Sequence, residues 1–363
     1  MKIINAGTKT TTISLGNTFN SSSESELLEL FRSSAYGNFH NFIFDFSNTG
    51  QIESSNPAVL VKLHAAARKL QGRLYAFGLK QSFVELFRLT GLYQGFCICA
   101  TIQQIIEASN IKDRGVISQI QGHLGKAGDS TPSNLNCWSP YIDTLQVPTM
   151  PAGVINLNVN GRKTAGPIQG YGQLWEKTYK LHLTDVGLSP LQVIEIMKTN
   201  FTGFQPPQNR FYPSERGIKP GEIIIINAST PGGLVATGVL VLYADEHTFT
   251  FITPQGHPEA GWVTFTAYEE NGSTMMQIQG LTRASDPIYE IAFRLTGSNL
   301  QQQIWIHVLD SLARHVGSKA TAQFSKQCLD HSLQWSRFPN MLQNAQISSM
   351  VYTVSHPSHI FRK

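Results

Sequence analysis

Two adjacent serines, Ser54 and Ser55, stand where a phosphate could be accepted and held. They follow the apolar run Phe42 to Phe46 and precede Asn56 and Pro57, which predict a helix with Asn56 as its N-cap and Pro57 as its first residue. Near a helix N-terminus, unpaired backbone N–H groups and the helix dipole favour negative charge. The spacing therefore fits a phosphorylated serine, although a serine that only caps the helix is the simpler alternative.

Three residues in the second half of the chain could meet a small molecule. His257 and Glu259 follow a predicted strand and could form an acid–base pair at a cavity mouth. A turn in which the backbone satisfies the histidine is the favoured alternative. Arg283 follows another predicted strand and could bind an anionic head group, but an arginine at a strand end is usually solvated or paired.

Other chemistry has less support. No grouping of His, Cys, Asp and Glu has metal-ligand spacing, and no Gly-rich loop follows a strand in a phosphate-cradling pattern. The 4 cysteines are scattered, which argues against a disulfide framework. We therefore expect no metal, no cofactor and no catalytic residue, although a Ser-His-Asp set is not singled out or eliminated.

Composition narrows the class of protein. A chain of 363 residues predicts two domains, and 41% hydrophobic with 14% charged residues is typical of a globular chain. A formal charge of +4 is too small to argue for nucleic acid. No apolar run approaches the roughly 18 residues of a spanning helix, and the N-terminus lacks a secretory apolar region, so we expect a cytoplasmic protein without a transmembrane segment.

The elements that must position Ser54 alternate between strands and helices, which predicts an α/β sheet covered by helices. The predicted strands are residues 2–6, 10–15, 42–46, 73–78 and 96–100. The predicted helices are residues 21–36, 56–71, 81–89 and 102–108.

Residues 1–108 resemble a STAS domain, the sulfate-transporter and anti-sigma-antagonist module. Phe44-Asp45-Phe46-Ser47 matches the end of its central strand, and Glu53-Ser54-Ser55-Asn56 matches its Asp-Ser-Ser-Gly signature, with Glu for Asp and Asn-Pro where the helix usually opens with Gly-Leu. The similarity continues through residues 63–69, 72–79 and 86–92. It implies a phosphoacceptor at Ser54, a switch loop of Glu53, Ser55 and Asn56, and an anti-sigma-like or kinase-like protein partner or self-association.

Residues 109–165 read as a linker, because Gly, Ser, Pro and Asn recur at 125–134 and hydrophobic periodicity is weak. Trp138, Tyr141, Ile142 and Leu145 are unusual in a linker, and we expect them to dock on one of the domains.

The pattern from 166 to 317 predicts an antiparallel α+β domain, followed by a tail at 318–363. The predicted strands are residues 174–183, 222–227, 236–243, 247–253, 262–269 and 274–281. Asn271-Gly272 predicts a type I′ hairpin turn. Ser189-Pro190 opens one helix, and Asp286-Pro287 opens a long amphipathic segment to Val316.

Residues from about 160 to 317 resemble the START-like (SRPBCC) superfamily, whose antiparallel sheet grips a long C-terminal helix. The similarity includes Gly256-His257-Pro258-Glu259 followed by Gly261 and an aromatic strand. It implies a cavity between the sheet and the helix for a lipid or other apolar small molecule, with Val263, Phe265 and Ala267 facing inward. The candidate lining residues are Tyr243, His257, Glu259, Phe265 and Arg283.

Together these features predict a non-enzymatic regulator with a protein-contact module, switched at Ser54, and a small-molecule module. One alternative is an enzyme, such as a cyclase or hydrolase, with the first domain as a scaffold. Another is an assembly protein in which the first domain only oligomerises. A polar network inside the second-domain cavity would favour the enzyme, and an apolar open cavity would favour binding.

Overall fold

The computed structural model describes residues 2–6, 9–19, 24–29, 31, 40–124, 133–150 and 153–356. The chain divides into two compact units, Met1–Leu135 and Asn136–Lys363, and each is described by itself. The predicted combination of a sheet with parallel strands and a separate antiparallel sheet is confirmed.

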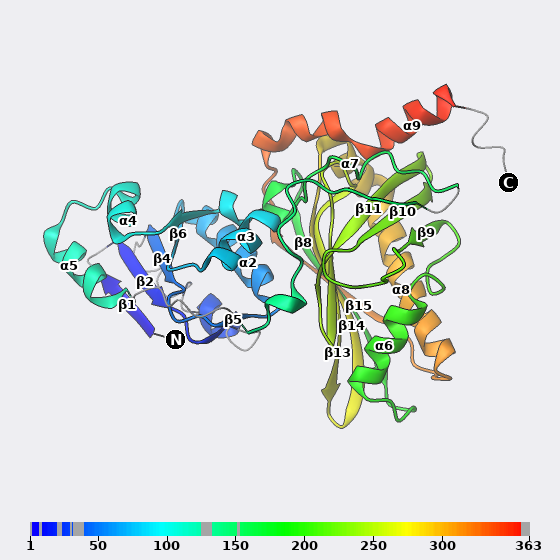
Figure 1. The fold of residues 1–363 in the computed structure, drawn as a ribbon, viewed down its shortest axis with the longest axis horizontal. Coiled ribbons are helices and arrows are strands. Elements are labelled where there is room, and N and C mark those ends of the chain that lie inside the picture. Colours follow the sequence, from blue (N-terminus) through cyan, green and yellow to red (C-terminus); the bar gives the residue numbers. More distant parts are fainter. Residues whose placement is uncertain are drawn as a thin grey trace. The chain divides into compact units, whose positions relative to one another are not determined.

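The first unit contains a five-stranded sheet in the order β1-β2-β4-β6-β7 (Figure 1). Strands β1 and β2 are antiparallel, whereas β2, β4, β6 and β7 are parallel to one another. These strands are β1 (Lys2–Ala6), β2 (Thr10–Ser14), β4 (Asn41–Asp45), β6 (Arg73–Phe77) and β7 (Phe96–Cys99). Two short strands missed by the sequence analysis, β3 (Thr18–Phe19) and β5 (Gln51–Ile52), form a separate parallel pair.

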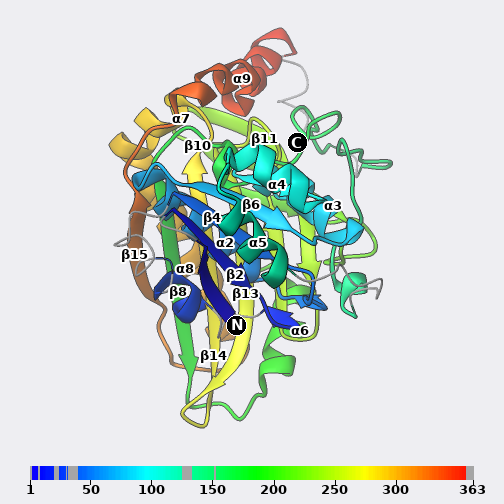
Figure 2. The same ribbon diagram turned by 90° about the vertical axis from the view of Figure 1, so that its left-hand side faces the viewer.

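Apolar side chains on both faces of this sheet explain its coverage by helices. On one face, the ring of Phe44 contacts that of Phe96, which in turn lies 5.7 Å from that of Phe87 in α3. On the other face, Ile43 joins a buried cluster with Ile105 of α4 and Ile120 of α5. Figure 2 shows α4 and α5 over the strands. The helices are α2 (Asn56–Lys69), α3 (Gln81–Leu89), η1 (Leu92–Gln94), α4 (Ile102–Ser109) and α5 (Arg114–His123).

Of the helix predicted over 21–36, residues 24–29 and 31 are described, and they are helical. The rest of that prediction lies outside the described residues.

The stretch predicted as a linker, 109–165, is largely packed where it is described. Helix α5 begins after Asp113, whose carboxylate accepts hydrogen bonds from the backbone of Gly115 and Val116. Further along, Leu145 and Val159 are fully buried in the second unit. Of the apolar side chains that looked unusual in a linker, Trp138 and Leu145 are buried, whereas Tyr141 is exposed. Residues 125–132 lie outside the described part.

The second unit is built on an eight-stranded antiparallel sheet in the order β15-β8-β14-β13-β12-β11-β10-β9. At its β13–β14 turn, Asn271 and Gly272 have φ of 52° and 76°, as the predicted type I′ turn requires. The strands are β8 (Leu174–Leu183), β9 (Asn209–Tyr212), β10 (Ile223–Thr230), β11 (Gly233–Ala244), β12 (Thr248–Ile252), β13 (Glu259–Glu270), β14 (Ser273–Ala284) and β15 (Gln323–Asp330).

Helices α6 (Pro190–Asn200) and α8 (Ser298–His315) pack on the same apolar face of this sheet. The long helix predicted from Pro287 is interrupted: α7 (Pro287–Ala292) runs into a π-helical turn, Phe293–Gly297, before α8 begins. Met197 of α6 and Leu309 of α8 are fully buried in the core that the helices share with the sheet.

The tail from 318 belongs to the second unit. Strand β15 extends the sheet beside β8. Arg283 and Asp330 form a buried ion pair at 2.6 Å that ties the end of β15 to β14. The chain continues through η5 (Trp335–Gln343) to α9 (Ala345–Ser355), and two further single turns lie at η2 (Leu135–Cys137) and η3 (Pro167–Gln169). None of the described helices combines the length and hydrophobicity needed to span a bilayer.

Candidate functional site

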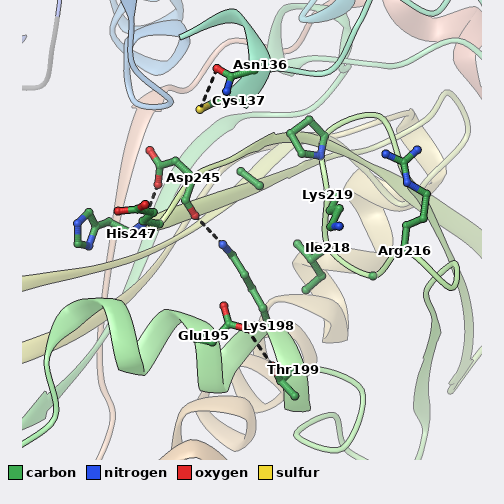
Figure 3. A pocket seen from close by; sticks show the side chains of 14 residues that line it. Asn136, Cys137, Glu195, Lys198, Thr199, Arg216, Ile218, Lys219, Asp245 and His247 are labelled. Atoms are coloured by element: carbon green, nitrogen blue, oxygen red, sulfur yellow. Dashed lines mark hydrogen bonds between the residues drawn. The ribbon is translucent and has the colours of Figure 1, made fainter.

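An open pocket of about 780 Å³ lies in the second unit (Figure 3). This volume falls within the range of small-molecule sites. Its walls come from α6, the loop between β9 and β10, the turn between β11 and β12, and the start of the unit. The lining residues are Asn136, Cys137, Glu195, Lys198, Thr199, Arg216, Gly217, Ile218, Lys219, Pro220, Ala244, Asp245, Glu246 and His247.

Asp245 organises one wall of the pocket. Its carboxylate accepts hydrogen bonds from the backbone of His247 and Thr248, at 2.8 and 2.7 Å, and from the Tyr243 hydroxyl. The Lys198 ammonium donates to the backbone carbonyl of Asp245 at 2.5 Å (Figure 3). Burial lowers the pKa of Lys198, although nearby carboxylates such as that of Glu195 oppose this effect. Helix α6 is thereby attached to the β11–β12 turn.

Cys137 and its neighbour Asn136 line the pocket wall formed by the start of the unit. Burial raises the pKa of its thiol, and the Asp245 carboxylate raises it further. A thiol kept protonated is a poor nucleophile. Cys137 is therefore poorly suited to act as a nucleophile in this pocket.

Tyr243, one of the predicted pocket residues, lies directly behind this wall. Its ring meets that of Trp138 edge-to-face at 4.7 Å, and its hydroxyl bonds Asp245. Trp138 also forms a β-bridge with Tyr243, which fixes the segment that carries Asn136 and Cys137.

His257 and Glu259 do not form the acid–base pair considered above. The backbone N–H of Glu259 donates to Nδ1 of His257 at 3.0 Å, as in the alternative of a backbone-satisfied turn. The Glu259 carboxylate instead accepts from Thr282 at 3.0 Å, pairs with Lys177 at 3.3 Å and bonds Gln301 of α8. It therefore ties three strands to the helix.

Phe265 and Arg283 are also engaged in packing. Phe265 stacks on Phe249 with ring centroids 4.4 Å apart and meets Trp305 of α8 at 5.4 Å. Arg283 donates to Asp330 and to the carbonyl of Gly172 at 2.7 Å, and is 3% exposed. Its guanidinium is thus committed to the protein rather than turned to a ligand head group.

The space between sheet and helix, where the sequence predicts a cavity, is occupied by aromatic side chains. Phe201, the residue after α6, packs against Phe249, Phe251 and Phe265 with ring centroids between 5.3 and 6.0 Å apart. As predicted, Val263, Phe265 and Ala267 face this core. The pocket of Figure 3 lies at a different place, between α6, the β9–β10 loop and the β11–β12 turn.

In the first unit, Ser54 is half-buried in the turn between β5 and α2. Ser55, and not Asn56, occupies the N-cap position, with φ −76° and ψ −22° and no side-chain capping hydrogen bond. The predicted cap is wrong because the backbone carbonyl of Ser55 accepts hydrogen bonds from Ala58 and Val59, at 3.1 and 3.4 Å, so Asn56 is already the first helical residue. The Ser55 hydroxyl bonds the fully buried Asn56 side chain at 3.2 Å. Glu53 accepts a backbone hydrogen bond from Asn56 at 3.1 Å, which closes the turn around Ser54.

A segment following α5 reaches this loop. Ser133 N–H donates to the carbonyl of Gly50 at 3.3 Å, and the Asn134 side chain donates to the carbonyl of Ile52 at 2.9 Å. The Gln51 side chain also bonds the Ser133 hydroxyl. Ser133 and Asn134 therefore hold β5, the strand that leads into Ser54. Asn134 stands two positions before Asn136, the first residue of the pocket wall.

Sequence reasoning missed Lys198, Asp245 and Cys137. Asp245 lies between the predicted strands 236–243 and 247–253, and Cys137 lies in the predicted linker. The one available signal was Trp138, an apolar residue that needed a docking site next to Cys137.

No protein-family model matches the chain, and no curated protein matches it. Solved structures are similar to parts of it. Protein Ms6760 from Mycobacterium smegmatis has a TM-score of 0.30 and 15% identity over 39% of this chain and 90% of its own. The di-domain ARO/CYC StfQ from the steffimycin biosynthetic pathway has a TM-score of 0.33 and 10% identity over 40% of this chain and 51% of its own. The anti-sigma factor antagonist SpoIIAA in its unphosphorylated form has a TM-score of 0.28 and 12% identity over 31% of this chain and 98% of its own.

Proposed function

We propose that the chain is a two-module regulatory protein, in which a STAS-like module contacts a protein partner and a helix-grip module binds a small molecule. The parallel strands of the first unit, with the Ser54 turn between β5 and α2, support the first assignment. The antiparallel sheet packed against α8, with a pocket of small-molecule size in the same unit, supports the second.

The observation that carries the proposal is the course of residues 133–138. Ser133 and Asn134 hold the strand before Ser54, and Asn136 and Cys137 then line the pocket. Trp138 anchors the far end of this segment on Tyr243. Because Asn134 and Asn136 are only two positions apart in the chain, we propose that a change in the Ser54 loop alters the pocket wall at Asn136 and Cys137.

Phosphorylation of Ser54 is the proposed switch. A phosphate adds about −1.5 to −2 charges at pH 7. Ser54 is half-buried and directly follows the Glu53 carboxylate, so a second negative group there favours rearrangement of the turn. Rearrangement would displace Ile52 from Asn134 and loosen the segment that leads to Cys137.

The pocket walls favour an amphipathic ligand over the purely apolar one predicted from sequence. Ile218 and Ala244 offer apolar surface, while Lys198, Lys219 and Arg216 offer positive charge. Arg216 is already paired with Glu222 at 2.8 Å. Lys198 already donates to the carbonyl of Asp245, so Lys219 is the cation proposed to meet a polar or anionic group of the ligand, on a wall that also carries Glu195 and Glu246.

Native mass spectrometry of the protein purified from its own cells tests this function. A bound small molecule adds a discrete mass, and Thr199→Trp, which places a large ring on the pocket wall, should abolish that mass. Leu191→Trp is the matched control, because Leu191 is 46% exposed on the same helix and does not line the pocket. No added mass on the wild type, or a mass retained in Thr199→Trp, would refute a ligand in this pocket.

A further inference from the structure

Helix α9 binds its own unit through small and polar side chains. Ala345 and Ser349 are fully buried, and the Ser349 hydroxyl accepts from the backbone N–H of Ala236 in β11 at 3.0 Å. An amphipathic helix on a globular domain ordinarily buries its apolar face. In α9 the polar face is turned to the protein.

Further hydrogen bonds fix this orientation. The Gln346 side chain donates to the carbonyls of Gly232 and Leu234, at 2.8 and 3.1 Å. The backbone N–H of Gln346 donates to the Tyr289 hydroxyl of α7 at 2.9 Å. Asn344 donates to the buried carboxylate of Asp286 at 2.8 Å and caps α9. The helix is therefore held with its apolar side outward.

The outward side is a continuous apolar stripe. Ile347, Met350, Val351 and Val354 are 43%, 52%, 64% and 81% exposed, and their spacing places them on one face of the helix. Because apolar surface is stabilised by removal from water, four such side chains exposed side by side are unfavourable for an isolated molecule.

The neighbouring elements extend the stripe into a patch. Trp335, Phe338 and Leu342 of η5 are 67%, 46% and 86% exposed. Ile291 of α7 and Leu295 of the following turn are also exposed. Figures 1 and 2 both place α7 and α9 at the same end of the unit. Apolar surface of this extent marks an interaction site rather than scattered exposure.

The charge of α9 indicates what covers its exposed face. Residues 345–355 include no Asp, Glu, Lys or Arg. Helices that lie on membranes are rich in Lys and Arg on their polar face, whereas α9 has none and uses that face against β11. Homodimer cores are enriched in aromatic residues and Met and depleted in Lys, Glu and Asp, which matches this surface.

We propose that the apolar face of α9, formed by Ile347, Met350, Val351 and Val354, is the interface with a second copy of this chain. In a two-fold contact each patch meets its own copy, so a charged patch would repel itself and an uncharged apolar one is self-complementary. The proposal is independent of the small-molecule pocket and of Ser54.

Sedimentation equilibrium of the full chain tests the interface. The wild type is expected to be a dimer, and the double variant Met350→Glu/Val354→Glu is expected to raise the dissociation constant about tenfold or more. Both side chains are more than half exposed, so the monomer fold should be retained, as tryptophan fluorescence can verify. Leu191→Glu, an exposed apolar position on α6, is the matched control and should leave the dimer unchanged.

A wild type that is monomeric at the highest soluble concentration overturns the proposal. If that monomer floats with phosphatidylcholine vesicles, the patch binds lipid instead. A wild-type dimer that the double variant leaves intact also overturns it, because the dimer then uses another surface.

Discussion

The side-chain amide of Asn134 donates to the backbone carbonyl of Ile52 at 2.9 Å, two residues before Ser54. Asn134 is half-buried and lies in the segment that leads from α5 to the pocket wall. This hydrogen bond attaches the segment that leads to Asn136 to the strand before Ser54.

Replacing Asn134 by Ala should free this segment. The variant loses the bond to Ile52, so amide hydrogen exchange of the peptide covering 133–138 should accelerate. Asn136→Ala is the matched control, because Asn136 is exposed and its side chain contacts the Cys137 thiol at 3.7 Å rather than β5. Equal exchange in Asn134→Ala and wild type would show that Asn134 does not hold the segment.

Asp330→Asn should destabilise the second unit by about 3–5 kcal/mol, because it leaves the Arg283 guanidinium buried without its counter-charge. All 5 tryptophans lie in this unit, so urea unfolding followed by tryptophan fluorescence reports on it alone. Asp143→Asn breaks the exposed pair with Lys163 and should leave the transition unchanged. A similar small effect in both variants would argue against a structural role for Arg283.

His257 predicts a pH dependence of the same transition. Burial lowers the pKa of His257, although the Glu259 charge opposes the effect. The unfolded chain therefore takes up a proton as the pH falls below about 6.5, while the folded chain resists it, so the free energy of unfolding falls there. The urea midpoint should drop between pH 7 and pH 5 in the wild type, and less in His257→Gln. An equal drop in both proteins would mean that His257 titrates alike in the folded and unfolded states.

Phe265→Ala should cost about 3–5 kcal/mol of unfolding free energy, because the ring fills the core between Phe249 and Trp305. Phe338→Ala removes a 46% exposed ring and should change stability by less than about 0.5 kcal/mol. If Phe265→Ala were as mild as the control, the ring would line a hydrated cavity, as the sequence suggested, rather than a packed core.

Local signals predicted much of the fold. The alternation over 174–183 and the Asn271-Gly272 turn depend only on neighbours in sequence, and both were located correctly. Helix α5 was missed although Asp113 followed by Val116 and Ile120 carries a cap and a helical apolar spacing. Half of the residues of strand β15 are exposed and its sequence is largely polar, so its pairing with β8 comes from tertiary context.

The pocket was harder to predict because its walls come from segments far apart in sequence. None of Tyr243, His257, Glu259, Phe265 and Arg283 lines it. Tyr243 is connected to the pocket by the hydrogen bond from its hydroxyl to Asp245, which is a lining residue. Sequence patterns showed that Phe265 faces inward, but not that Phe201 would fill the space it faces.

The link between Ser54 and the pocket is tested most directly by the reactivity of Cys137. The rate of alkylation by iodoacetamide, followed by mass spectrometry of the Cys137 peptide, should differ between wild type and Ser54→Asp by about fivefold or more, the lower end of typical coupling between sites. Ser54→Asn, which matches Asp in shape without its charge, should behave like the wild type, and Cys328 of β15 is the internal reference. An unchanged Cys137 rate in Ser54→Asp would contradict the link.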